Sequence, residues 1–323
     1  HSDGQSKHSI ARGSFHGITF LHELCHAVGL KHPHERGLLM QPRFPGLQRW
    51  SNEYRDKGIY NQNAHPFTQL SYVDKGARNG YVPQTIEDFG FLKSLGALDI
   101  AALQWLYGVN IDHATGSNVY WLPIENKEST GWKAIWDAGG RDRIDGSRAK
   151  TSVTIDLRNA TLDQSEHAGG YISSVEGVFG GFTIAHDWNG TTPEDSAGLC
   201  IIEDATGGAV DDRLIGNMAS NRLRGRKGDD LLYGGVGGRD VLIGGRGRDQ
   251  FWIDTRPGSF AKVKDFRVGI DQLVFSVQKI DLSLERVGRH LVIEHADSPV
   301  ARLLGVSSIS LNQDAIFGDF SGI

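Results

Sequence analysis

The chain has 323 residues, of which 39% are hydrophobic and 23% charged, and its formal net charge is −5. These values suit a globular protein of about two domains and exclude a disordered tail. Acidic residues outnumber basic ones, 39 to 34, and no run of apolar residues is long enough to cross a bilayer. We therefore expect no nucleic-acid partner and no membrane span.

The cysteines and the first residues of the sequence bear on where the protein works and on whether the chain was processed. Cys25 and Cys200 are too few and too far apart to form a disulfide framework, which excludes a disulfide-stapled scaffold but not a secreted protein. The chain opens on HSDGQSKHSI, without an initiator Met or an apolar signal region. We expect a fragment or a processed product.

Residues 22–32, HELCHAVGLKH, form the first informative motif, H-E-x-x-H-x-x-G-x-x-H. On a helix capped by Ser14, His22 and His26 lie one turn apart and face the same way. Gly29 allows the left-handed turn that brings His32 back as a third ligand. Three imidazoles leave one zinc position open for water, as in catalytic sites. The alternative is a set of solvated histidines on a surface helix.

The motif resembles the metzincins, and among them the serralysin-like secreted bacterial metalloproteases. Ser71 and Tyr72 match the Ser-Tyr pair that follows the family's methionine turn, although Leu70 stands in place of the methionine. The resemblance implies that Tyr72 is an extra zinc ligand that also stabilises the oxyanion. Residues 98–108, LDIAALQWLYG, resemble the helix that closes the protease domain. The spacing of Ile100, Leu103 and Leu106/Tyr107 predicts a buried helix there.

The implied reaction is peptide-bond hydrolysis. Glu23 would take a proton from a zinc-bound water as general base, and zinc with Tyr72 would hold the negative oxygen. Only 21 residues precede His22, fewer than the family carries there, so we expect the catalytic domain, 1–112, to be truncated at its N-terminus. This sequence is therefore expected to lack one wall of the substrate cleft, and both an active and an inactive fragment stay open.

Residues 135–145, IWDAGGRDRID, resemble the family's calcium turn WDAGGxD. The match points to Asp137, Gly139 and Asp142 as calcium-binding residues. The partner segment HATGSNVY, 113–120, is loosely kept, and Ala114 stands where the family has Arg. The alternative is an Asp-Gly turn between two strands.

Residues 207–252 hold 12 of the 42 glycines and divide into five nonapeptides, with Gly234 inserted. They follow the G-G-x-G-x-D-x-U-x pattern of calcium-bound parallel β-rolls, where U is a large apolar residue. A flexible glycine linker is the alternative, but a linker gives no reason for an apolar residue every nine or ten positions. The U positions, expected to fill the interior, are Leu214, Leu223, Leu232, Leu242 and Phe251.

Two nonapeptides make one coil, so turns on one side recur after about eighteen residues. The first column of turns carries Asp212, Asp230 and Asp249, and the second carries Asn221 and Asp240. Calcium prefers anionic oxygen ligands, so the second column is predicted to bind fewer or weaker ions. The turn glycines expected at the calcium sites are Gly207, Gly225 and Gly244.

At the C-terminal end, residues 263–275 resemble the family's strand pair that caps the roll. Residues 318–323, GDFSGI, resemble the tail read by type I exporters of Gram-negative bacteria. With a calcium roll before that tail, secretion by this route is the coherent expectation, with extracellular calcium driving the roll to fold.

We expect an α+β metzincin C-terminal part followed by an all-β domain, 113–323, with a parallel β-roll at 207–252. The predicted function is a secreted, monomeric zinc endopeptidase that acts on proteins or peptides and is stabilised by Ca²⁺. The alternative is a catalytically inactive relative that serves as a calcium-dependent extracellular binding module. Retention of Glu23 beside the three histidines favours the enzyme. The absence of a G-x-S-x-G motif argues against a lipase with a similar roll.

Overall fold

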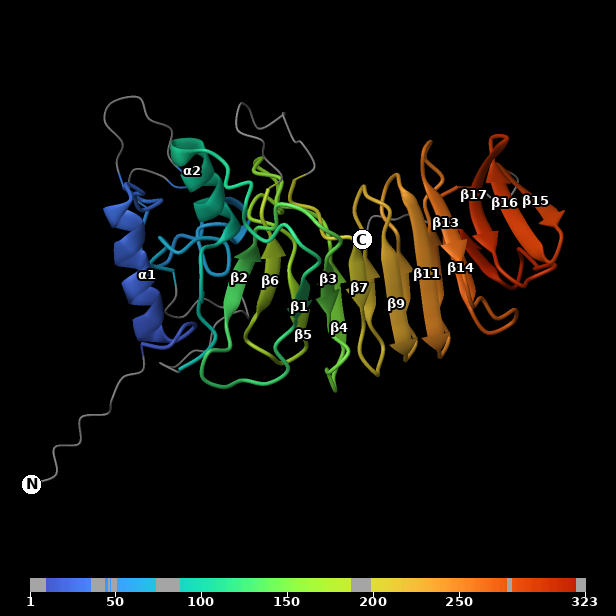
Figure 1. Ribbon diagram of the computed structural model, residues 1–323, viewed down its shortest axis with the longest axis horizontal. Helices are drawn as coiled ribbons and strands as arrows, with labels where there is room; N and C mark the ends of the chain where they lie inside the picture. The colour runs from blue at the N-terminus through green and yellow to red at the C-terminus, as the bar shows by residue number, and fades with distance from the viewer. Residues whose placement is uncertain are drawn as a thin grey trace, which may run out of the picture.

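The computed structural model is mostly β: two nine-stranded sheets run along the long axis, with the helices at the N-terminal end (Figure 1). This confirms the β-rich part of the expected fold. In the described part of the chain, no helix is both long and apolar enough to cross a membrane. The structure describes residues 10–35, 44–45, 47, 51–73, 88–186, 199–277 and 281–317.

The N-terminal end contains α1 (Phe15–Ala27), the short 3-10 helix η1 (Ile59–Asn61) and α2 (Ala97–Tyr107). Ser14 caps α1 as predicted, since its hydroxyl oxygen accepts a hydrogen bond from the backbone N–H of Gly17. Gly29 follows the helix with a φ of 92°, which confirms the left-handed turn. The chain can therefore return towards α1 immediately after the helix ends.

Helix α2 differs from its prediction. Ile100 and Leu103 are only partly buried, while Leu106 and Tyr107 are 52% and 69% exposed. The residues that are buried instead include Asp99, whose carboxylate accepts hydrogen bonds from the Thr68 hydroxyl and from two backbone N–H groups. The helix is anchored by this polar contact at its start, so apolar spacing alone gave the wrong face.

The first sheet has the strand order β1-β3-β7-β9-β11-β13-β17-β16-β15. In chain order, these strands are β1 (Val119–Trp121), β3 (Arg143–Asp145), β7 (Asp204–Thr206), β9 (Arg222–Lys227), β11 (Arg239–Arg246), β13 (Phe260–Val263), β15 (Leu282–Val287), β16 (His290–His295) and β17 (Ser298–Leu303).

The second sheet has the strand order β18-β14-β12-β10-β8-β4-β5-β6-β2. In chain order, these strands are β2 (Trp132–Ile135), β4 (Val153–Asp156), β5 (Ser173–Val175), β6 (Gly181–Ile184), β8 (Arg213–Ile215), β10 (Leu231–Tyr233), β12 (Gln250–Ile253), β14 (Gln272–Phe275) and β18 (Ala315–Phe317).

Between residues 204 and 263 the chain alternates strictly between the two sheets, and each strand pairs in parallel with the strand one coil away. The five predicted interior residues are fully buried, and they stack in register: Leu232 lies between Leu214 and Phe251 in one sheet, and Leu223 pairs with Leu242 in the other. Because successive side chains of a strand point to opposite faces, the inward-pointing residues of each strand build the interior of the parallel coil.

The coil continues beyond residue 252. Strands β13 and β14 lie in opposite sheets, each in parallel register with the preceding coil, so residues 263–275 extend the roll and do not form a capping pair. Strands β17 and β18 add one further strand to each parallel stack. The edge of the first sheet is instead completed by the antiparallel strands β15 and β16.

Candidate metal centres

The three motif histidines converge at one point. The Nε2 atom of His32 lies 2.9 Å from that of His22 and 3.0 Å from that of His26. Together they are the one cluster of metal-ligating side chains in the described residues, with ligand atoms within 4.8 Å of one another. The helix carries the first two, and the turn at Gly29 returns the third.

The other ring nitrogens face oxygen acceptors. His22 Nδ1 lies 2.9 Å from the carbonyl oxygen of Gln69, and His26 Nδ1 lies 2.9 Å from that of Leu30. His32 Nδ1 contacts the carboxylate of Glu35. Such partners place the proton on Nδ1 and turn the Nε2 lone pair inward. Burial lowers the pKa of His32. The donor set therefore fits a zinc ion, which takes neutral imidazole nitrogens.

The histidine cluster borders a cavity of about 220 Å³ lined by both predicted catalytic side chains, Glu23 and Tyr72. Glu23 is exposed, one position along α1 from a ligand. The Tyr72 ring stacks on His22, with centroids 5.4 Å apart, and lies 4.5 Å from the His32 ring. Burial raises the pKa of Tyr72, so its hydroxyl is protonated at neutral pH. The structure therefore brings together all five predicted residues.

Residues 70–72, which include Tyr72, are held in place by packing and by a hydrogen bond to the backbone. Leu70 is 4% exposed and packs with Cys25 and Leu30, an apolar role that suits leucine where the family has methionine. Ser71 donates a hydrogen bond from its hydroxyl to the carbonyl oxygen of Asn63. These contacts fix the position of Tyr72.

Four residues near the cluster were missed by sequence reasoning: His34, Glu35, Tyr54 and His65. Tyr54 stacks almost parallel on Tyr72, with centroids 5.5 Å apart, and His65 lines the cavity. Glu35 follows His32 by three residues, a spacing that could have indicated a carboxylate partner for the ligand. Nothing in the sequence pattern indicated Tyr54.

Asp137 and Asp142, two of the predicted calcium residues, are both fully buried. The Asp137 carboxylate accepts hydrogen bonds from Tyr120 and from the backbone N–H of Gly139. Burial raises the pKa of Asp142 to about 7, and the nearby carboxylates of Asp137 and Glu203 act in the same direction. Buried like charges of this kind fit a cation site.

The first column forms a ladder of carboxylates along the roll. Asp212 Oδ1 accepts a hydrogen bond from the N–H of Val153, and Asp230 and Asp249 each accept one from the preceding aspartate of the column. The ladder continues to Asp271, which accepts from the N–H of Asp249. This aspartate was missed because a longer turn separates it from Asp249, although it precedes a buried Leu273 as in the nonapeptides.

The glycines at the start of these turns make room for the carboxylates. A Cβ atom on Gly207, Gly225 or Gly244 would lie 2.1 to 2.3 Å from an oxygen of the aspartate that ends the same turn. The predicted need for glycine is therefore explained at these three positions by close approach, not by a positive φ.

Buried carboxylates in both columns carry unusual pKa values. Burial raises the pKa of Asp230 to about 8, with neighbouring Asp212 and Asp249 adding to the shift, and burial raises that of Asp240 to about 8. Asp230 Oδ2 is buried and has no hydrogen-bond partner among the described residues. An orphaned carboxylate oxygen among like charges fits a bound calcium ion.

The second column has a different chemistry. Asp240 Oδ1 accepts a hydrogen bond from the N–H of Asn221, which continues the ladder pattern. Asn221, however, presents an amide in place of a second carboxylate oxygen, and this amide donates to Glu203 O and to Asn217 Oδ1. The two columns are therefore unequal in charge and in hydrogen bonding.

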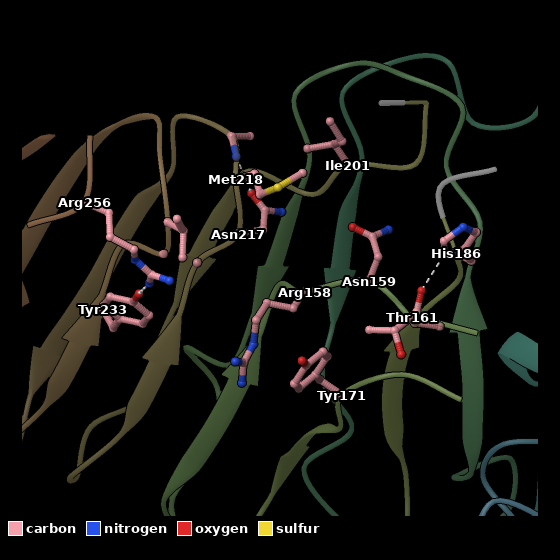
Figure 2. Close-up of a pocket in the computed structure, with 15 residues that line it drawn as sticks. Arg158, Asn159, Thr161, Tyr171, His186, Ile201, Asn217, Met218, Tyr233 and Arg256 are labelled. Atoms are coloured by element: carbon pink, nitrogen blue, oxygen red, sulfur yellow. Dashed lines mark hydrogen bonds between the residues drawn. The ribbon is translucent and has the colours of Figure 1, made fainter. Parts of the chain in front are cut away.

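A larger cavity, of about 640 Å³, lies away from the histidine cluster, at the turns that follow β4, β8 and β10. Figure 2 shows Asn217 on its wall, with Arg158 and Tyr171 on one side and Tyr233 and Arg256 on the other. Both arginines are engaged: Arg158 pairs with Asp156, and Arg256 bonds to Asp254 and to the Tyr233 hydroxyl. The described residues of its lining include no cluster of metal ligands.

Comparison with known proteins identifies the family and several relatives of this chain. The family model described as Peptidase M10 serralysin C terminal matches residues 99–297. Serralysin B of Dickeya chrysanthemi is 34% identical over 208 residues, which cover 61% of this chain and 35% of that protein. Serralysin of Photorhabdus laumondii is 31% identical over 217 residues, 64% of this chain and 38% of that protein.

Metallopeptidase AprA of Pseudomonas marginalis is 31% identical over 286 residues, which cover 82% of this chain and 50% of that protein. The chain thus spans between about a third and a half of the length of these relatives. The matched region includes most of the parallel coil and the buried Asp137–Asp142 turn. The chain belongs to the serralysin C-terminal family of M10 peptidases.

Proposed function

We propose that this chain is part of a secreted zinc endopeptidase whose roll is stabilised by calcium. The observation that carries the proposal is the convergence of three imidazole nitrogens beside a cavity lined by Glu23 and Tyr72. The names of the relatives, serralysin and metallopeptidase, support the same reaction class. A binding module would need neither Glu23 nor the polarised ligands.

His22, His26 and His32 would hold the zinc ion, and Tyr72, whose ring packs against two of these histidines, would act as a further ligand. Zinc bound there would supply a Lewis acid for water and for the scissile carbonyl. The Glu23 carboxylate would accept the proton of the attacking water and return it to the leaving amine. The protonated Tyr72 hydroxyl would donate a hydrogen bond to the developing oxyanion.

The calcium ions would lie between successive turns of the first column and at the Asp137–Asp142 turn. Their role would be structural, since binding to carboxylates that are brought together only in the folded coil stabilises that coil. We place the protein outside a Gram-negative cell, exported by a type I system that reads the tail. That tail, 318–323, lies outside the described residues, and deleting it should keep the protein inside the cell.

The test is a comparison of the parent with Glu23→Ala and His26→Ala, assayed for casein cleavage and for zinc content by mass spectrometry. The proposal predicts zinc in the parent and in Glu23→Ala, and cleavage only in the parent. His26→Ala should lose both. A Glu23→Ala variant that cleaves casein as fast as the parent contradicts the proposed reaction.

One alternative has support from the chain itself. Leu70 stands where the family has methionine, and a catalytically inactive relative would use its calcium-dependent coil to bind another molecule outside the cell. A zinc-loaded parent without cleavage activity, but with calcium-dependent folding, would favour that function.

A further inference from the structure

Two side-chain amides join the turn 216–221 to the backbone carbonyl groups of Leu157, Ile202 and Glu203. We propose that Asn217 and Asn221 take the place of a calcium ion there, so that this junction of the roll is held without metal. The proposal rests on the proposed calcium roll and identifies a coil interval that departs from it.

The turn that ends at Asp212 shows which hydrogen bonds an aspartate makes at the position of Asn221. Asp212 uses Oδ1 to accept the N–H of Val153 in the preceding coil, and Oδ2 to accept the N–H of Gly208, four residues earlier. Asn221 keeps the second contact, with Oδ1 accepting the N–H of Asn217 at 2.8 Å. Its other atom is a nitrogen, which donates to Glu203 O at 3.0 Å. The contact towards the preceding coil has reversed from acceptor to donor.

Asn217 completes the exchange. It occupies the position that Gly208 holds in the first-column turn, and its Nδ2 donates to Leu157 O at 3.0 Å and to Ile202 O at 2.9 Å. Its Oδ1 accepts from the N–H of Ala219 and from Nδ2 of Asn221. The network is nearly dry, since Asn217 and Asn221 are 8% and 1% exposed.

These bonds leave no place for a cation. Calcium binds through the lone pairs of carbonyl and carboxylate oxygens, typically six to eight of them. Here the carbonyl oxygens of Leu157, Ile202 and Glu203 already accept amide hydrogens. An amide nitrogen is a donor and cannot act as a ligand in this orientation. The contrast is Asp230, whose buried Oδ2 has no partner among the described residues.

The place of the amide pair in the chain gives it a role. Leu157 directly follows β4, Ile202 and Glu203 directly precede β7, and 216–221 form the first tight turn of the second column. Buried hydrogen bonds do not depend on the calcium concentration. The junction therefore stays closed in a chelator, while the aspartate intervals lose their ions.

The test converts the amides to carboxylates. In the full chain, Asn217→Asp/Asn221→Asp should melt about 5 °C or more below the parent in EGTA, because buried carboxylates would face three carbonyl oxygens. In calcium chloride most of that difference should disappear, and mass spectrometry should find roughly one more calcium per chain. Asn221→Asp alone serves as the second variant if the double variant fails to fold.

Asn159→Asp is the matched control. The Asn159 amide also bridges two backbone carbonyls, those of Ala185 and Cys200, but outside the nonapeptide turns. It should destabilise the chain in EGTA without gaining calcium or calcium rescue. If calcium rescues Asn159→Asp to the same extent, the rescue is not specific to the turn 216–221 and the proposal is wrong.

Two results overturn the proposal directly. One is an Asn217→Ala/Asn221→Ala variant that binds one calcium ion fewer than the parent, since the two asparagines would then be calcium ligands. The other is a folded Asp variant that melts in EGTA as the parent does. A parent that binds no calcium at all refutes the proposed calcium roll instead, and the melting in EGTA still decides whether the amides close the junction.

Discussion

The carboxylate of Asp230 accepts a hydrogen bond from the backbone N–H of Asp212, 2.9 Å away in the preceding coil. This contact uses only Oδ1 of Asp230, and Oδ2 remains buried without a partner among the described residues. Each aspartate of the first column joins two coils in this way, and the second oxygens of Asp212 and Asp249 accept bonds from Gly208 and Arg267.

The first prediction compares the two columns. Asp230→Ala should lose more bound calcium than Asp240→Ala, because Asp230 lies between two aspartates of its column and Asp240 faces the amide of Asn221. Calorimetric titration of the calcium-depleted variants measures both. Equal losses from the two variants would contradict the unequal columns.

The second prediction concerns pH. Burial raises the pKa of Asp230 and of Asp240 to about 8, against ~4 in the unfolded chain. Between these values the calcium-free folded state binds protons that the unfolded state does not. The two carboxyl groups therefore cost no stability below pH ~4 and destabilise the calcium-free fold progressively as the pH rises to ~8. Calcium binds the ionised carboxylates, so its affinity should rise over the same range.

Thermal unfolding in EGTA and in calcium chloride, from pH ~5 to ~9, tests this linkage. The melting temperature should fall with pH in EGTA, and the gap between the two buffers should widen. The slope in EGTA should be smaller in Asp230→Asn, which has no proton to lose. A parent whose melting temperature in EGTA rises over this range would contradict the prediction.

The third prediction concerns the carboxylate that contacts His32. Glu35→Gln should weaken zinc binding by about 10- to 100-fold, because the carboxylate orients the imidazole and makes it more basic. Competition with a zinc chelator measures the affinity. Glu53→Gln is the control, since Glu53 pairs with His34, which is not a motif ligand; it should bind zinc nearly as the parent does.

The fourth prediction concerns a turn glycine. Gly225→Ala should destabilise the chain by about 1–3 kcal/mol, because its Cβ would lie 2.1 Å from Oδ2 of Asp230. Chemical denaturation in calcium measures the change. Gly116→Ala, whose Cβ would meet no atom within 4 Å, should change stability little. Equal effects at both glycines would show that close approach is not the reason for Gly225.

The sequence predicted the histidine cluster and the coil interior because both depend on short, fixed spacings. Ser14, Gly29 and the interior position of Leu232 follow from local rules of capping, turn conformation and alternation. Asp271 escaped that reasoning because the turn before it has a different length. Its ladder contact with Asp249 forms only when the chain is folded into the coil.

Contacts between distant segments were also out of reach. Tyr54 stacks on Tyr72 from a segment with no repeat or motif, and Asn217 bonds to Leu157 across sixty positions. Helix α2 shows the opposite failure: its apolar residues Leu106 and Tyr107 follow a buried pattern but lie exposed. Spacing reports which residues share a face, and not what covers that face.

The carboxylate ladder has a direction. From Val153 through Asp212 and Asp230 to Asp249, every N–H points towards the next coil, and each bond of the ladder joins two neighbouring coils. Such a stack behaves as a one-dimensional chain of nearest-neighbour couplings. Damage to one rung should therefore split the roll into two blocks that unfold separately, so that a single substitution yields two transitions where the parent has one.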